Sequence, residues 1–326
     1  MSVEHPAPKT DLVAWHHLRV EVPDTWEVTA YSVEDRVGRL EFNDRDGLLA
    51  TIGWEPCERE PDREGTMRVF LQNNVLGADA RRRIVPDDLE TADVGPFRLG
   101  WDRQGTGPCQ ALAYHAADRK LLRWVFEPRT RSGGLRWNAA LAPILSTWGF
   151  NDGPEKEYRL HRLHCRLPAD YELEDVIVLP ANVKFVFEHP THRRRAIFRR
   201  WGMAEMILRG LSVGAFHAHI LKTDGDSIHA QTPCAVSGME ACLTEFDAPR
   251  EHHADRFMAR RWKGGQGVVW YDREEMRLYA FEQIGPANSP PLDFAATIPG
   301  RELQLPGGIG TAPVRGGQAA DGRRRS

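Results

Sequence analysis

Two stretches, one in each half of the chain, decide the fold that the sequence predicts. Leu121–Glu127 has the sequence LLRWVFE, and Met276–Glu282 has the sequence MRLYAFE. Each alternates apolar and polar residues around aromatic side chains, a pattern typical of half-buried β-strands. A polar turn precedes each stretch, at Ala117–Arg119 and at Asp272–Arg273, so each is the second strand of a predicted hairpin. The two hairpins correspond in register, which suggests that the chain contains one unit twice.

Further elements repeat in the same order on either side of these hairpins. Leu18–Glu27 (LRVEVPDTWE) and Leu163–Glu172 (LHCRLPADYE) are predicted strands that end at a proline turn, with an aromatic residue three positions later. Short amphipathic helices are expected over Thr66–Leu76 and Ser212–Lys222, and another helix over Trp137–Trp148. The shared order predicts a tandem duplication. The alternative is that amphipathic strands resemble one another in any protein.

The first half resembles the PsbP-like fold in its order of elements. The motifs that carry the resemblance are VPDTW at Val22–Trp26 and ILSTWGF at Ile144–Phe150. The fold occurs in a photosystem II extrinsic protein, a Ran-binding nuclear transport factor and bacterial chaperones for secretion effectors. The resemblance covers Trp15–Phe150 well and Tyr158–Pro286 loosely, since Tyr171 stands in place of the tryptophan. It implies an α+β protein with two tandem lobes, each an antiparallel sheet flanked by helices, without a shared catalytic motif.

This resemblance and the turn chemistry set the expected domain boundaries. The link between the lobes is placed at the turn sequence Asn-Asp-Gly-Pro, which begins at Asn151. From Pro306 the chain is rich in Gly, Pro, Gln and Arg, which bury too little surface to order it. The predicted parts are an N-terminal extension (1–14), lobe 1 (15–150), a linker (151–157), lobe 2 (158–286) and an extended, largely disordered tail (287–326).

The composition is that of an ordinary globular protein. The chain has 326 residues, 41% of them hydrophobic, and a formal net charge of −3. This charge does not favour a nucleic-acid partner, which usually selects a basic surface. No apolar run approaches the roughly 20 residues that span a bilayer, and no secretory signal is visible. The five scattered cysteines are expected to be reduced, so we expect a cytoplasmic protein with no membrane partner.

Candidate catalytic and metal-binding residues have weak support in the sequence. Four histidines of the second half, His161, His164, His217 and His219, are the candidates for a metal site, because imidazole binds zinc, nickel and copper. The chain has no HExxH motif, no nucleophile elbow and no phosphate-binding glycine loop. No catalytic residue and no cofactor are therefore assigned, and the histidines have an ordinary explanation as core and surface residues.

Candidate binding residues are tryptophans beside charged or polar neighbours and apolar residues of the tail. Trp15 precedes two histidines, Trp262 lies between two basic residues, and Ile309 and Val314 are potential anchors in the tail. A core position is the alternative for each tryptophan, and an inert tail is the alternative for the last two. The sequence thus favours a non-catalytic intracellular binding or scaffold protein with an unidentified protein partner. The competing hypothesis is a metal-dependent enzyme or metalloprotein.

Overall fold

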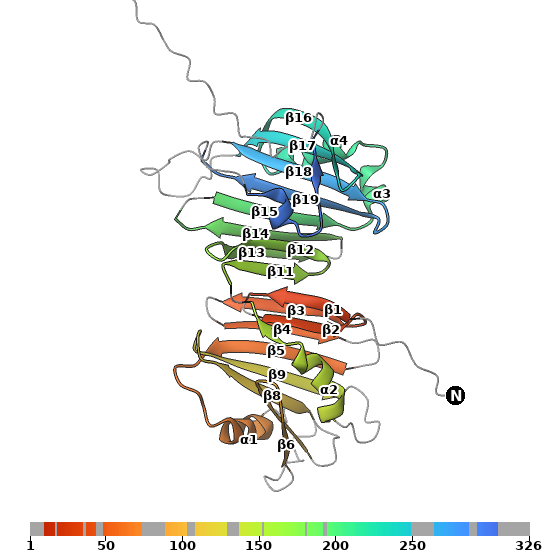
Figure 1. Ribbon diagram of the computed structural model, residues 1–326. Coiled ribbons are helices and arrows are strands. Elements are labelled where there is room, and N and C mark those ends of the chain that lie inside the picture. The colour runs from red at the N-terminus through yellow and green to blue at the C-terminus, as the bar shows by residue number, and fades with distance from the viewer. Residues whose placement is uncertain are drawn as a thin grey trace, which may run out of the picture. The chain divides into compact units, whose positions relative to one another are not determined.

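The chain folds into two compact units, 1–151 and 152–326. Each unit consists mainly of antiparallel strands (Figure 1). Within the part of the chain described here, no helix is long and apolar enough to cross a membrane. The computed structural model describes residues 10–16, 18–34, 37–43, 48–73, 89–102, 108–128, 137–151, 153–179, 181–191, 194–248, 264–286 and 292–305.

The first unit contains a seven-stranded sheet in the order β3-β4-β5-β9-β8-β7-β6. Outside it, β1 (Thr10–Trp15) and β2 (Leu18–Pro23) form a hairpin, and the short β10 (Gly149–Phe150) pairs with β2. Helices α1 (Arg63–Asn73) and α2 (Trp137–Ser146) pack on the strands. The strands of the large sheet are β3 (Glu27–Glu34), β4 (Val37–Asn43), β5 (Leu48–Pro56), β6 (Leu89–Val94), β7 (Phe97–Asp102), β8 (Cys109–His115) and β9 (Lys120–Pro128).

Aromatic side chains from the alternating strands form the core of this unit. Trp26, which follows the proline turn, lies 5.8 Å from Phe42 and 6.5 Å from Phe126 between ring centroids. Phe42 also stacks on Trp124 at 5.9 Å. Trp124 and Phe126 are two positions apart on β9 and so share one sheet face, which collects the large apolar groups whose burial stabilises the unit.

The second unit contains an eight-stranded sheet in the order β13-β14-β15-β19-β18-β17-β16-β20. Outside it, β11 (Glu155–Leu160) and β12 (Leu163–Pro168) form a hairpin. Helix α3 (Ala204–Leu208) follows β15, and α4 (Val213–Thr223) packs on β16, β17 and β18 (Figure 1). The strands of the large sheet are β13 (Glu172–Leu179), β14 (Asn182–His189), β15 (Arg194–Trp201), β16 (Ser227–Val236), β17 (Met239–Asp247), β18 (Gly265–Asp272), β19 (Arg277–Ile284) and β20 (Leu303–Gln304).

The two large sheets are connected in the same order, apart from β20 at the edge of the second one. Phe126 of β9 is paired with Ala50 of β5. Phe281 of β19 is paired with Phe198 of β15, the corresponding strand. The common order and register agree with what a tandem duplication would produce, and the duplication itself stays our inference.

The predicted α+β class is wrong, because the protein is mostly β with three antiparallel sheets and few helices. The expected helices correspond to α1, α2 and α4, while α3 and α5 have only five and four residues. Several strands went unrecognised in the sequence. Three of these, β3, β13 and β16, contain a β-bulge in their pairing, for example between Leu173 and Asp175. A bulge inserts one residue and shifts the alternation to the other phase, which conceals the strand pattern.

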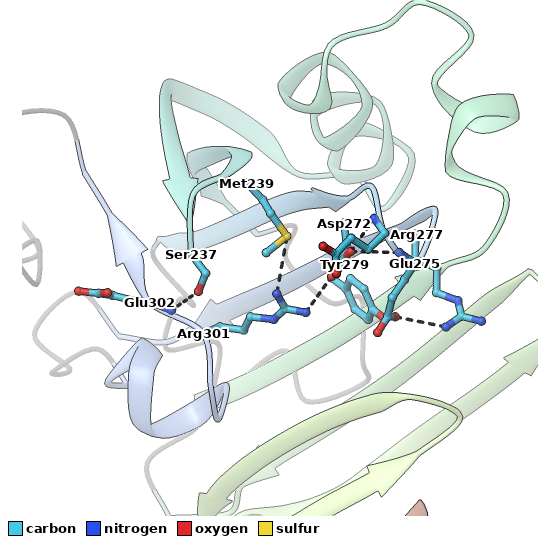
Figure 2. Close-up of polar contacts among 9 residues, drawn as sticks. Ser237, Met239, Asp272, Glu275, Arg277, Tyr279, Arg301 and Glu302 are labelled. Atoms are coloured by element: carbon cyan, nitrogen blue, oxygen red, sulfur yellow. Dashed lines mark hydrogen bonds and ion pairs between the residues drawn. The ribbon is translucent and has the colours of Figure 1, made fainter. Parts of the chain in front are cut away.

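The segment expected to be an extended tail is partly folded. Helix α5 (Phe294–Thr297) places Phe294 against Trp270 at a centroid distance of 6.0 Å, and β20 pairs with β16. Arg301 Nη2 lies 2.8 Å from Asp272 Oδ2 (Figure 2). Residues 292–305 therefore belong to the second unit, because they cover the sheet and pair with its edge strand. At the other boundary, β11 begins at Glu155, inside the predicted linker.

Candidate functional site

The structure changes the assessment of the predicted binding residues. Trp15 is fully buried at the end of β1, where its ring packs edge-on against His16 and Tyr31. It cannot serve as an exposed contact, and the prediction failed because flanking histidines do not reveal on which side of a hairpin a tryptophan lies. Trp262, Ile309 and Val314 lie outside the described residues.

The four candidate histidines do not form a metal site in the described part of the chain, where no group of three or more metal-ligating side chains occurs. His161 lies in the β11–β12 turn, and His164 on β12 places Nε2 2.6 Å from Oε1 of Glu157. His217 and His219 lie on α4, where the first is buried and the second exposed. Each histidine thus has a separate environment.

A buried polar cluster lies between α4 and the sheet of the second unit. Thr244, Gly267 and Glu282 pair side by side on β17, β18 and β19, and so share one sheet face. His217 on α4 places Nδ1 3.0 Å from Thr244 Oγ1 and Nε2 3.5 Å from Glu282 Oε1. A side chain at Gly267 would begin only 2.9 Å from the His217 ring, so glycine permits this approach. On the other side, Arg199 Nε lies 3.1 Å from Glu282 Oε1.

The electrostatics of this cluster favour a charged Glu282. Burial raises the pKa of Glu282, but Arg199 and His217 outweigh burial, so this pKa lies below its ordinary value. At the rim, the Asp224 carboxylate also pairs with Arg199. Because Glu282 and His217 are almost fully buried, substrate cannot reach them, and the cluster acts as an anchor that holds α4 on the sheet.

An exposed apolar surface lies at one end of the same sheet. It consists of Leu179 at the end of β13, Met203 and Met206 around α3, and Met276 in the β18–β19 turn, which we call the end surface. Their relative exposures are 55%, 56%, 59% and 59%. Grouped apolar side chains in water mark interaction sites more often than scattered ones do.

Two backbone hydrogen bonds bring the parts of the end surface together. The N–H of Gly202 donates to the carbonyl of Ala181 at 3.0 Å, which joins the end of β15 to the β13–β14 turn. The N–H of Ala204 donates to the carbonyl of Met276 at 3.2 Å, which joins α3 to the β18–β19 turn. Met203 and Met206 are three positions apart at the start of α3, and the carbonyl of Met203 accepts a hydrogen bond from within the helix.

Two of these methionines occupy a backbone conformation that favours glycine or asparagine. Met203 has φ 55° and Met276 has φ 53°. The left-handed region costs a residue with a side chain roughly 1–2 kcal/mol. The chain therefore keeps two methionines where both the backbone conformation and exposure to water disfavour them, and such outliers concentrate at functional sites. The sequence analysis missed this surface because its parts are distant along the chain.

Comparisons with known proteins give little further information. No family model matches the chain, so the PsbP-like resemblance has no support from that comparison. No curated protein matches it either. Among solved structures, the chain is similar to the apo structure of the immunity protein TplEi of T6SS from Pseudomonas aeruginosa. That match has 12% sequence identity and a TM-score of 0.32, and it covers 91% of this chain and 97% of the other.

Proposed function

We propose that this protein is a non-catalytic binding protein whose protein partner docks on the end surface of the second unit. The observation that carries the proposal is the grouping of Leu179, Met203, Met206 and Met276, all more than half exposed, at one end of one sheet. Methionine suits such a role, because its flexible and polarisable side chain adapts to the shape of a partner.

The energy available from this surface is moderate. Complete burial of a Leu or Met side chain contributes ~1.5–3 kcal/mol, so covering four half-exposed ones contributes about 4 kcal/mol. Association must also overcome the loss of translational and rotational freedom. The end surface alone therefore supports weak binding, and specific recognition needs polar contacts around it.

We also propose that the protein acts in a reducing compartment of the cell. All five cysteines are free thiols, and Cys109, Cys165 and Cys242 are buried. Burial raises the pKa of the Cys165 thiol well above its ordinary value, so this side chain is a poor nucleophile and an unreactive part of the core.

The test is affinity capture from the native host with surface variants as bait. Met203→Glu combined with Met206→Glu places charges on the end surface, and Val69→Glu places one on an equally exposed apolar site of α1 in the first unit. A stoichiometric partner should be retained by the parent and by Val69→Glu and lost by the double variant, with unchanged melting of all three proteins. If all three proteins retain the same partner, the end surface is not the docking site.

A further inference from the structure

Strand β13 lies at one edge of the large sheet of the second unit. Within the part of the chain that the structure describes, β14 is its single neighbour in that sheet. An edge strand offers unpaired backbone N–H and C=O groups, which proteins usually protect with prolines, charges, bulges or a covering segment. At the opposite edge, β16 contains Pro233 and a bulge between Ile228 and Ala230, and β20 pairs with its end.

The protection of β13 is confined to its first half. A bulge in its pairing with β14 directly precedes Asp175. Three exposed acidic residues lie in this half, namely Glu172, Glu174 and Asp175. The last three residues, Ile177–Leu179, include neither a charge nor a proline. Leu179, which belongs to the end surface, is 55% exposed. The second half of β13 is therefore an unprotected edge that continues the proposed docking surface.

Three side chains of β13 form a row on the sheet face that carries the helices. Asn182 of β14 is paired with Leu179 on one side and with Trp201 of β15 on the other. Directly paired residues project from the same face, and Trp201 packs with residues of α3 and α4. Asp175 and Ile177 stand at alternate positions from Leu179, so all three side chains lie on this face.

The β11–β12 hairpin packs on the other face of the sheet. Tyr158 of β11 lies edge-on against Phe187 of β14, with the ring centroids 4.6 Å apart. Phe187 and Asn182 are five positions apart on a regularly paired strand, so their side chains project from opposite faces. This hairpin therefore leaves the row of Asp175, Ile177 and Leu179 uncovered.

The first half of β13 carries an excess of negative charge. Arg195 of β15 lies 3.3 Å from a carboxylate oxygen of Glu174 and 3.5 Å from one of Glu188. Glu172 and Asp175 form no ion pair among the residues that the structure describes. Two of these four carboxylates are thus available to positive charges of another molecule.

From these observations we infer that the partner contributes an extended, basic and apolar segment that pairs with the edge of β13. The inference rests on the function proposed above, since Leu179 belongs to both surfaces. In such strand addition, main-chain hydrogen bonds give affinity and alternate side chains give specificity. All pairings of this sheet are antiparallel, and the segment takes the same direction.

The row on β13 determines which residues the segment needs. Side chains directly opposite each other on one face are in contact, and opposite charges there are favourable. Apolar residues therefore lie opposite Leu179 and Ile177, and Lys or Arg lies opposite Asp175. Read from its N-terminus, the segment has the pattern apolar-x-apolar-x-basic. A second copy of β13 does not supply this pattern, because its sequence ELEDVIVL contains no basic residue.

A random-peptide display selection with the full chain as bait tests this inference. The parent should enrich the pattern apolar-x-apolar-x-basic. Asp175→Lys should replace the basic preference by an acidic one, because it reverses the charge that faces this position. The matched control is Glu27→Lys, since Glu27 is an exposed acidic residue on β3, the corresponding edge strand of the first unit. It should select the same peptides as the parent.

A synthetic peptide from the selection then gives the magnitude. Asp175→Lys should weaken its binding about tenfold or more at low salt, and Glu27→Lys by less than about twofold, with unchanged melting of all three proteins.

Methylation of the peptide's backbone nitrogens distinguishes strand addition from docking by side chains alone. Only every second residue of an added strand directs its N–H towards the neighbouring strand. Methylation at alternate positions should therefore weaken binding about tenfold or more in one register and by less than about threefold in the other. Equal effects of the two registers would overturn the inference.

The remaining outcomes separate the two proposals. Peptides that bind Asp175→Lys like the parent, but are lost when Met203→Glu and Met206→Glu are combined, would leave the end surface as the docking site and refute strand addition. Peptides lost with Asp175→Lys and kept by the double methionine variant would refute the end surface and leave β13 as the docking edge.

Three further results would count against the inference. Peptides that bind every variant as they bind the parent would refute both proposals, and so would a selection that enriches nothing. A parent that sediments as a dimer while Asp175→Lys sediments as a monomer would make a second copy of the chain the occupant of this edge.

Discussion

Arg199 and Glu282 form an ion pair across neighbouring strands of the second unit, with Nε 3.1 Å from Oε1 and only 7% and 1% of the two side chains exposed. Burial of both charges is unfavourable unless each one is well paired and hydrogen-bonded. His217 completes the surroundings of Glu282, and Asp224 those of Arg199. The pair therefore connects β15, β19 and α4, and its removal affects the whole unit.

We expect Arg199→Met to lower the free energy of unfolding by about 3–5 kcal/mol at pH 7, because Glu282 stays buried without its main partner. Urea denaturation measures the loss. The control is Arg195→Met on the same strand, whose partly exposed side chain pairs with Glu174 and Glu188. This control should lose less than about 1 kcal/mol. Equal losses in the two variants would contradict the assigned role of the buried pair.

Asp226 is expected to make the stability of the second unit depend on pH. Burial, and then the Glu282 and Asp224 carboxylates, raise the pKa of Asp226 from 3.8 to about 7, against the effects of Arg199 and Lys184. Since the folded state holds this proton more tightly, the favourable contribution is complete below pH 3.8 and is lost as the pH rises toward 7.

Asp226→Asn should therefore melt at a higher temperature than the parent above pH 7 and differ little from it near pH 4. Thermal melting at a series of pH values measures this difference. Asp247→Asn, at an aspartate with more than half of its side chain exposed, is the control and should follow the parent. If the melting temperatures of Asp226→Asn and the parent changed with pH in parallel, the pKa of Asp226 would not be raised in the folded protein.

Phe126 and Phe281, at corresponding core positions of the two large sheets, should both contribute strongly to the stability of the protein. Phe126 is fully buried and Phe281 is 3% exposed. Truncation of a buried phenylalanine to alanine costs about 3–5 kcal/mol through lost burial and the cavity left behind. We expect Phe126→Ala and Phe281→Ala each to lower the melting temperature clearly in calorimetry, and Val37→Ala, at a half-exposed site, to have little effect. A phenylalanine variant that melts at the same temperature as the parent would show that its strand is misplaced.

Two truncations distinguish the folded C-terminal segment from the tail. A chain that ends at Leu305 should melt like the full chain, because it keeps α5 and β20. A chain that ends at Pro286 should melt at a lower temperature, because it loses the contacts of Phe294 with Trp270 and of Arg301 with Asp272. Circular dichroism during heating measures both. Unfolding of the longer truncation would mean that residues 306–326 are part of the fold.

Arg162→Gly should show that the arginine reduces stability. Arg162 has φ 61°. Glycine adopts positive φ without steric cost, so we expect a gain of up to about 1 kcal/mol. Arg119→Gly relieves the same backbone conformation and should give a similar gain. Chemical denaturation measures both gains, and a loss of stability in both variants would contradict the backbone strain assigned to these two positions.

Local features of the fold could be predicted from the sequence, because they depend on neighbouring residues. The hairpin strand at Leu121–Glu127 lies within β9, and the helix expected over Ser212–Lys222 corresponds to α4. The bulged strands could not be recognised, since one inserted residue disturbs the alternation. The share of helix was therefore overestimated.

The sequence by itself determined where the chain turns and which residues alternate, because those properties follow from backbone preferences and side-chain periodicity over a few residues. Only the tertiary structure decided that Trp15 is buried and that Met203 and Met276, distant in the sequence, come together. These positions depend on which strands pair and in which register. Pairing is a long-range choice among strands of similar composition, and it is settled by the packing of the whole sheet.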